Sequence, residues 1–187
     1  MGFFSNLFGK NKSPNTKNNE KEVTNATEKK LELVVLSPIN GVVKFLSEVS
    51  DPVFAEEMTG KGVAIVPKIG EKIVKSPIKG KVKVAFPTGH AYGIATEEGP
   101  ELLVHIGIDT VELDGKGFVK KVEVDNDIDA GMDLCDLDLE VIKENEKETD
   151  IIVIATNDSI VNFELELIVK NGAEVKIGEP IFKLNKK

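Results

Sequence analysis

The 187-residue sequence contains no tryptophan, one tyrosine, two histidines and one cysteine. The single cysteine, Cys135, excludes a disulfide within the chain and suits a reducing compartment. No apolar run approaches the roughly 20 residues that a helix needs to span a bilayer. The formal net charge of −8 makes the chain as a whole repel nucleic acid. We therefore expect a cytoplasmic protein that binds no nucleic acid.

The first 30 residues differ in composition from the rest of the chain. Residues 11–30 are largely Asn, Lys, Glu, Ser and Thr, which cannot bury enough apolar surface to become ordered. We predict a flexible leader over residues 1–30 and a folded domain over residues 31–187. Residues 1–9 place several apolar side chains at helical spacing ahead of lysines. Two interpretations stay open: an amphipathic helix in transient contact with the inner face of the membrane, and a leader with chance apolar residues.

Short apolar runs separated by Gly and Pro dominate the rest of the chain. Helical periodicity is limited to single turns expected over residues 54–58 and 158–163. Many short strands are typical of an all-β fold. The segment Ser37–Val43 recurs as Ser76–Val82, and a Gly-centred loop pattern recurs as well. These repeats favour two related halves packed as a β-sandwich or barrel.

Both histidines fall in one predicted hairpin, with strands over residues 90–96 and 101–108 and a four-residue turn between them. This turn would place His90 opposite Gly107. Opposed residues share a sheet face, as do residues two apart, so His90 and His105 become diagonal neighbours with Cα atoms ~7–8 Å apart. A register shift of one residue would put them on opposite faces.

Side-chain alternation gives each strand of this hairpin a core face and a histidine face. The predicted core face holds Leu102, Val104, Ile106, Ile108, Ala91, Gly93 and Ala95. The predicted histidine face holds Glu101, Leu103, His105, Gly107, Asp109, His90, Tyr92, Ile94 and Thr96. The residues alone leave the role of the histidines open, because imidazole serves as nucleophile, base or metal ligand and is often purely structural.

Two motifs surround the histidines. Residues 99–111 are Gly-Pro-Glu-Leu-Leu-Val-His-Ile-Gly-Ile-Asp-Thr-Val, and residues 88–91 are Thr-Gly-His-Ala. The first resembles the signature around the phosphorylated histidine of the glucose-type enzyme IIA proteins of the bacterial sugar phosphotransferase system. The second resembles the segment that holds the second active-site histidine of that family. Residues 51–56 and 60–65 also resemble family segments, and the resemblance, from about Leu31 to the C-terminus, implies a duplicated barrel-sandwich.

The resemblance implies a phosphotransferase component that carries a phosphoryl group on histidine. It implies His105 as the acceptor, attacking through Nε2 while a backbone carbonyl such as that of Gly107 holds Nδ1–H. It implies that His90 donates a hydrogen bond to the phosphoryl oxygens, since such transfers depend mainly on positioning and charge stabilisation. Thr88 has two open interpretations, a hydroxyl that orients His90 and an ordinary turn residue.

Six further residues are candidates for the surroundings of the histidines. Four are expected to form an apolar surround that excludes water, with core packing as the alternative: Val53, Phe54, Phe86 and Leu103. Asp51 and Asp109 are expected at the rim, where they would pair with basic groups of partners. The alternative for both aspartates is a local role in turns.

The expected partners also follow from the resemblance. The phosphoryl group would come from the histidine-containing phosphocarrier protein and pass to the IIB domain of a membrane sugar permease. We expect a stand-alone monomer with no required cofactor. Regulatory targets are also expected, because an exposed site that gains charge is a natural switch.

Two other classes of function stay open. His90 and His105 could form a weak zinc site completed by Asp109, Glu101 or a carboxylate of a partner, because zinc needs more than two ligands. The domain could instead be a non-catalytic binding module, in which case no donor would phosphorylate either histidine. Metal content and phosphorylation distinguish these alternatives.

Overall fold

The computed structural model describes residues 31–187, so the predictions for residues 1–30 lie outside the described residues. Strands dominate, and none of the described helices is long and apolar enough to cross a membrane. The elements in chain order are β1 (Glu32–Leu36), β2 (Gly41–Phe45), the 3₁₀ helix η1 (Leu46–Glu48), α1 (Pro52–Ala55), β3 (Gly60–Pro67), β4 (Ile73–Lys75), β5 (Gly80–Ala85), β6 (Ala91–Ala95), β7 (Glu101–Ile106), the 3₁₀ helix η2 (Thr110–Leu113), β8 (Phe118–Lys120), β9 (Asp127–Ile128), β10 (Asp133–Leu137), α2 (Leu139–Glu144), β11 (Ile151–Thr156), α3 (Asn157–Asn162), β12 (Phe163–Leu167), β13 (Glu174–Val175) and β14 (Pro180–Lys186).

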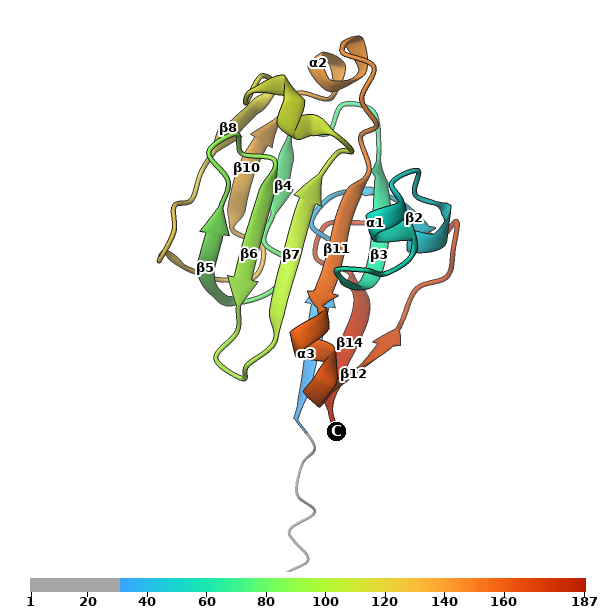
Figure 1. Cartoon of the computed structure of the whole chain (residues 1–187), viewed down its shortest axis with the longest axis vertical. Coiled ribbons are helices and arrows are strands. Elements are labelled where there is room, and N and C mark those ends of the chain that lie inside the picture. The colour runs from blue at the N-terminus through green and yellow to red at the C-terminus, as the bar shows by residue number, and fades with distance from the viewer. Residues whose placement is uncertain (1–30) are drawn as a thin grey trace, which may run out of the picture.

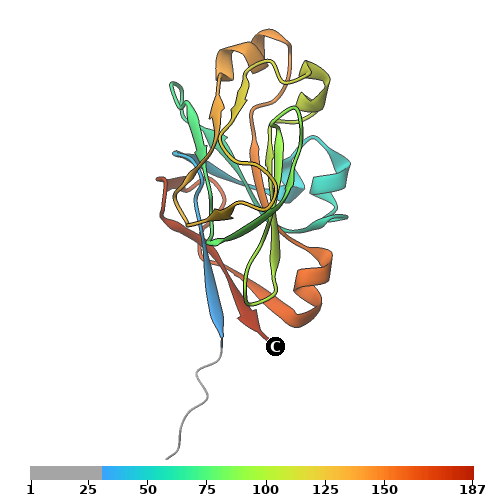
Figure 2. The ribbon, with the colours of Figure 1, turned by 90° about the vertical axis from the view of Figure 1, so that its left-hand side faces the viewer.

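Antiparallel sheets build the fold. The largest has eight strands in the order β13-β2-β3-β11-β7-β6-β5-β9, and two three-stranded sheets have the orders β1-β14-β12 and β4-β10-β8. Side chains from all three sheets meet in one main core. In Figure 1, α2 lies at one end of the molecule and α3 at the end where the chain terminates, and Figure 2 shows the same arrangement from the side. The all-β sandwich that the sequence predicts is confirmed.

The repeated segments make equivalent local bonds. The hydroxyl of Ser37 donates to the carbonyl oxygen of Ile39 at 2.7 Å, and the hydroxyl of Ser76 donates to that of Ile78 at 2.6 Å. Both serines are buried. Because a buried hydroxyl needs a partner, each copy of the repeat closes its own turn in the same way.

The two copies also hold each other. The N–H of Leu36 donates to the carbonyl of Pro77, and the N–H of Lys75 donates to that of Pro38, both at 2.9 Å. This reciprocal exchange is what two related halves facing one another produce. The duplication inferred from the sequence is therefore visible in the backbone hydrogen bonds.

Glycine is required at the same place in each copy. A Cβ on Gly41 would lie 2.3 Å from the carbonyl oxygen of Val66, and a Cβ on Gly80 would lie 2.4 Å from that of Ala95. A Cβ atom does not approach non-bonded atoms this closely, so neighbouring strands can come near these positions only because no side chain is present.

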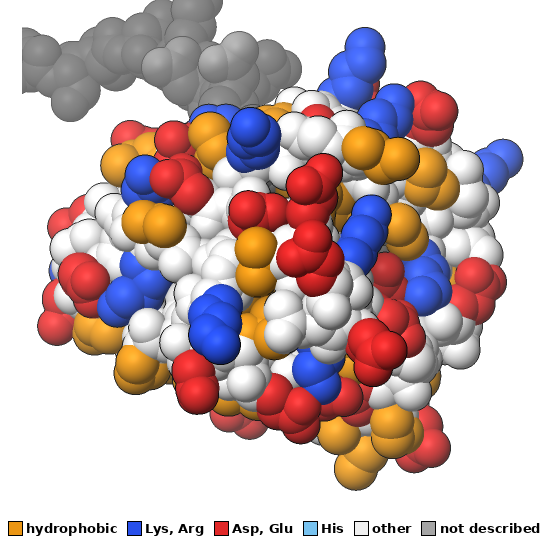
Figure 3. Space-filling model, turned by 90° about the horizontal axis from the view of Figure 1, so that it is seen from above, with side chains coloured by type: hydrophobic (Ala, Val, Ile, Leu, Met, Phe, Trp, Pro, Cys, Tyr) orange, Lys and Arg blue, Asp and Glu red, His pale blue; other side chains and the backbone are white. Residues whose placement is uncertain are grey.

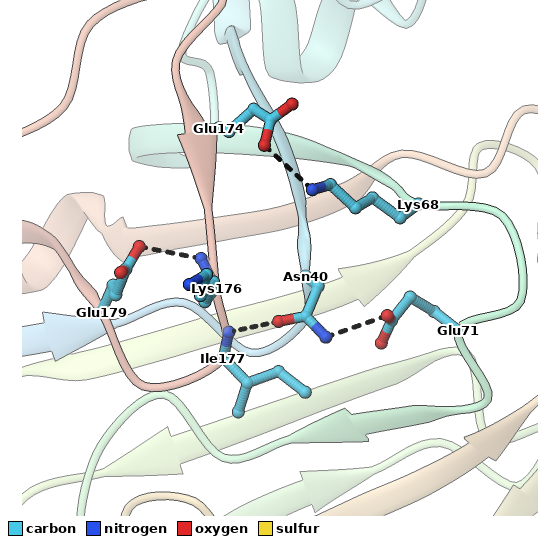
Figure 4. A network of polar contacts seen from close by, with 7 residues as sticks. All are labelled: Asn40, Lys68, Glu71, Glu174, Lys176, Ile177 and Glu179. Atoms are coloured by element: carbon cyan, nitrogen blue, oxygen red, sulfur yellow. Dashed lines mark hydrogen bonds and ion pairs between the residues drawn. The ribbon is translucent and has the colours of Figure 1, made fainter.

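A polar network joins two of the Gly-containing turns (Figure 4). The amide of Asn40 donates to the carboxylate of Glu71 at 2.9 Å, and the side-chain oxygen of Asn40 accepts the N–H of Ile177 at 2.9 Å. Nearby, Lys68 and Glu174 form an ion pair at 2.9 Å. Asn40, which corresponds to Lys79 in the second repeat, thus ties two turns that are distant in the sequence.

The helices are more numerous than the sequence predicts. Short helices form near both expected turns: α1 begins two residues before the predicted 54–58 and ends three residues before its end, and α3 is shifted by one residue, whereas α2, η1 and η2 are additional. Six-residue α2 spans less than two turns, too short for periodicity to reveal it. Its one local signal is Asp138, whose carboxylate caps the helix by accepting the N–H groups of Glu140 and Val141.

The predicted register of the β6–β7 hairpin is wrong by one residue. Ala95, and not Thr96, lies opposite Glu101. Thr96 belongs to the loop because its N–H and its hydroxyl both donate to the carbonyl of Pro100, at 2.9 and 3.0 Å. The connection is therefore one residue longer than predicted.

This shift exchanges the two faces of β6. Ala91 lies opposite His105 and shares its face, together with Gly93 and Ala95, contrary to the prediction. The prediction that Tyr92 and Ile94 lie on the histidine face is also wrong. Both are fully buried in the main core, with the correctly assigned residues Leu102, Val104 and Ile106.

Ile108 is the remaining misplaced residue. Gly107, with φ of 74°, ends β7 and turns the chain away from the strand direction. Ile108 then packs beside Phe54 in a second, smaller apolar cluster on the outer face of the large sheet. This second cluster consists of Leu46, Val49, Phe54, Ala64, Ile108, Ile152 and Ile154, with Leu103 packed against it.

Because the Ser37 and Ser76 hydroxyls make equivalent buried bonds, we predict that Ser37→Ala and Ser76→Ala each lower the free energy of unfolding by about 1–2 kcal/mol. Chemical denaturation measures the change. Ser50→Ala, at an exposed position, is the matched control and should leave stability unchanged. Wild-type stability in only one of the two buried variants would contradict the equivalence of the halves.

Candidate functional site

The structure brings the two histidine rings together. Their centroids are 5.1 Å apart, with an interplanar angle of 77°. With the observed register, alternation would place His90 on the face opposite His105. His90 escapes alternation because β6 begins one residue later and Gly89, with φ of 74°, bends the chain just before it. The predicted proximity is therefore present, but for a different reason.

His105 is held in one tautomer by the backbone. Its Nδ1 lies 2.8 Å from the carbonyl oxygen of Gly107. A carbonyl can only accept, so Nδ1 carries the proton, and in the neutral ring Nε2 keeps its lone pair. The contact thus exposes Nε2 as the nucleophilic atom.

The turn that supplies this carbonyl is fixed at several points. The N–H of Ile106 donates to the carbonyl of His90 at 2.7 Å, and the buried hydroxyl of Thr110 donates to the carbonyl of Ile106 at 2.5 Å. A Cβ on Gly107 would lie 2.3 Å from Cγ2 of Thr110. Glycine at 107 is therefore required both for the positive φ and for space.

His90 has its own positioning partner. The hydroxyl of Thr88 lies 2.5 Å from Nδ1 of His90. A hydroxyl that donates to Nδ1 leaves the proton on Nε2, which can then act as a donor. The ring of Phe86 packs against His90 with centroids 5.0 Å apart. The site residues Thr88, Phe86 and His90 thus form one local unit.

Apolar side chains border the pair. Phe54 is 6% exposed, belongs to the second cluster and packs its ring 5.1 Å from that of His105. Val53 and Phe86 are 39% and 44% exposed, and Leu103 packs partly buried against the second cluster. Phe54 and Leu103 therefore lie on the buried side of the site, whereas Val53 and Phe86 present an apolar surface to solvent.

Asp51 and Asp109 lie near enough to act on His105 through their charges. Asp51 also accepts the N–H of Val53 at 2.8 Å and so caps α1. Asp109 takes a left-handed conformation with φ of 56° after the Gly107 turn and is exposed. The cap at Asp51 has the local role that the sequence suggests, and both carboxylates remain available at the edge of the site.

Burial keeps both histidines neutral. Burial, and after it the neighbouring His90, lowers the pKa of His105 from 6.5 to about 4, against smaller upward effects of the Gly107 bond, Asp51 and Asp109. Burial also lowers the pKa of His90. At neutral pH the imidazole of His105 is therefore unprotonated at Nε2 and able to attack an electrophile.

The site offers few ligands to a metal. Among residues 31–187, no group of three or more His, Cys, Asp or Glu side chains is placed to hold an ion. The Nδ1 atoms of both rings already have partners, so each ring offers only Nε2. Zinc would need its remaining ligands from another molecule.

The end of the molecule at which α2 lies is a mixed-charge surface. Figure 3 shows acidic and basic side chains interspersed over this end, without a large patch of one sign. One pair there joins Lys147 to Glu112 at 2.5 Å. Hydrophobic side chains are scattered among the charged ones in Figure 3.

The fold and the site together define an all-β protein with a paired-histidine site of neutral, oriented imidazoles. Residues 33–161 match the family described as phosphoenolpyruvate-dependent sugar phosphotransferase system, EIIA 1. The chain belongs to this family, whose members carry phosphoryl groups in sugar transport.

Relatives and a solved structure agree with this assignment. The glucose-specific EIIA component of Staphylococcus epidermidis is 45% identical over 145 residues, 75% of this chain and 86% of that protein. The glucoside-specific EIICBA component of Staphylococcus carnosus is 42% identical over 81% of this chain, which spans only 21% of that longer protein. The glucose permease IIA of Mycoplasma capricolum has a TM-score of 0.74 at 42% identity, covering 82% of this chain and 96% of that one.

The lowered pKa of His105 predicts a pH-dependent stability. Between pH 6.5 and about 4 the unfolded chain binds a proton at His105 that the folded chain does not. The free energy of unfolding should therefore fall as pH falls through this window, by up to about 3 kcal/mol from this group. Urea denaturation of the wild type and His105→Gln at several pH values isolates the contribution. A wild-type-minus-variant difference that stays constant from pH 4 to 7 would contradict the account.

Proposed function

We propose that His105 is the residue of this EIIA-family chain that accepts and releases the phosphoryl group. The observation that carries the proposal is the bond from Nδ1 to the carbonyl of Gly107, which leaves Nε2 with a lone pair beside a second histidine. Burial of both rings supports it, because only a neutral imidazole can attack.

The transfer step balances on these atoms. The lone pair of His105 Nε2 forms a bond to phosphorus as the bond from phosphorus to the donor's nitrogen breaks and its electron pair returns to the donor. The proton on Nδ1 stays in place, shared with Gly107. His90, oriented by Thr88, donates from Nε2 to a phosphoryl oxygen, which stabilises the charge of the transferring group.

The surroundings suit a site that a partner closes. Val53 and Phe86 offer exposed apolar surface beside the rings, and a docked protein that covers them excludes water and so limits hydrolysis. Asp51 and Asp109 at the edge would pair with basic side chains of that partner. We propose the histidine-containing phosphocarrier protein as donor.

The IIB domain of a sugar permease is the proposed acceptor. The name of the Staphylococcus carnosus relative, an EIICBA component, joins an A unit to B and C units in one chain, which supports such a partner. We propose that this chain works as a cytoplasmic monomer at the inner face of the membrane, needs no cofactor for the transfer and signals to regulatory targets through its phosphorylation state.

The proposal predicts different effects for the two histidine variants. With labelled phosphoenolpyruvate, the first enzyme of the system and the phosphocarrier, the wild type should gain acid-labile label, and His105→Ala should gain none. His90→Ala keeps the nucleophile and loses one donor, so transfer in at least one direction should slow by about 10²–10³-fold. Rapid-quench labelling measures both.

The same labelling experiment can also contradict the assignment of His105 as the phosphoryl acceptor. Label that persists in His105→Ala and disappears in His90→Ala would reverse the assignment. The absence of label in the wild type, together with stoichiometric zinc in elemental analysis of the complex with a partner, would favour the zinc site formed by His90 and His105. The absence of both label and zinc would favour a non-catalytic binding module.

A further inference from the structure

The turn that orients His105 rests on a neighbouring segment, residues 148–150. The N–H of Gly107 donates to the carbonyl of Asp150 at 2.9 Å, and the N–H of Ile108 donates to the carbonyl of Glu148 at 3.0 Å. The N–H groups of Gly107 and Ile108 flank the carbonyl that holds His105. The position of residues 148–150 therefore determines the hydrogen bonds of both.

The hydrogen bond to the carbonyl of Glu148 is made by the same peptide group that accepts the proton of His105. Gly107 contributes the carbonyl, and Ile108 the N–H, of a single peptide group. Its oxygen accepts Nδ1–H of His105, and its N–H donates to Glu148. Hydrogen bonds in such a chain polarise one another, so the bond to Glu148 strengthens the acceptor that His105 uses.

The side chains of the same segment converge on Lys44. The ammonium of Lys44 lies 2.7 Å from the carboxylate of Asp150 and 3.9 Å from that of Glu148. The Asp150 side chain is 6% exposed and that of Lys44 is 24% exposed. A carboxylate this buried needs its partner, so this ion pair is more than a surface contact.

The sheet places Lys44 on the face of His105. Lys44 on β2 lies opposite Ala64 on β3, Ala64 lies opposite Ile152 on β11, and Ile152 lies opposite His105. Asp150 precedes Ile152 by two residues and so has the same orientation.

We propose that Lys44 is a positioning residue for His105, acting through Asp150 and the Gly107 turn. The ion pair fixes segment 148–150, the two carbonyls of that segment fix the peptide between residues 107 and 108, and this peptide fixes the tautomer and the direction of the ring. The consequence for phosphoryl transfer rests on the proposed role of His105, whereas the consequence for the ring does not.

The test compares Lys44→Met, Lys44→Arg and the double variant Lys44→Met/Asp150→Asn, which removes the pair without leaving a buried charge. Lys183→Met is the control, because Lys183 forms a more exposed ion pair with Glu32 on another sheet. All assays run where denaturation shows each variant folded. The readouts are the ¹⁵N spectrum of His105, the solvent exchange of its Nδ1 proton and the rate of phosphoryl transfer.

We expect Lys44→Met and the double variant to accelerate exchange of the Nδ1 proton, to mix the two neutral tautomers and to slow transfer by about tenfold. Lys44→Arg should recover most of the wild-type behaviour, and Lys183→Met should retain all of it. Wild-type exchange and tautomer in both the single and the double variant would overturn the proposal. If the wild type accepts no phosphoryl group, the proposed function fails, while the ring spectra still decide the role of Lys44.

Discussion

The hydrogen bond between Nδ1 of His105 and the carbonyl of Gly107 is the interaction on which the site depends. It decides which nitrogen has the lone pair, and the turn that supplies it has little freedom. Gly107 combines a positive φ with the absence of space for a Cβ, and the buried hydroxyl of Thr110 closes the turn. A side-chain oxygen in place of this backbone carbonyl would position the ring of His105 less precisely, because a side chain can adopt several rotamers.

Burial gives the site its chemistry, and incomplete burial gives it access. Phe54 of the second cluster packs against the ring of His105, and burial lowers the pKa of this histidine, so the ring stays neutral at neutral pH. The exposed apolar side chains beside it leave one side open. A partner that docks there would complete the dry environment that an electrostatically stabilised transfer requires. One side of His105 is therefore buried and keeps the ring neutral, and the other side is open to a partner.

The sequence predicted the architecture and the histidine pair because their signals are local: short apolar runs, the repeat around Ser37 and Ser76, and the motifs at 88–91 and 99–111. The predicted register of the β6–β7 hairpin was wrong because it depends on whether one residue belongs to the strand or to the loop. Thr96 could end a strand or begin a loop, and two bonds to Pro100 decided it. The pair of Lys44 with Asp150 has no local signal at all, since 106 positions separate its members.

The most direct measurement is the identification of the phosphorylated nitrogen in the ¹⁵N-histidine-labelled, phosphorylated protein by ³¹P and ¹⁵N NMR. The account predicts phosphorus bonded to Nε2 of His105, with Nδ1 still protonated and hydrogen bonded to Gly107. Phosphorus on Nδ1 would mean that the ring abandons the Gly107 carbonyl to react, and it would contradict the central claim.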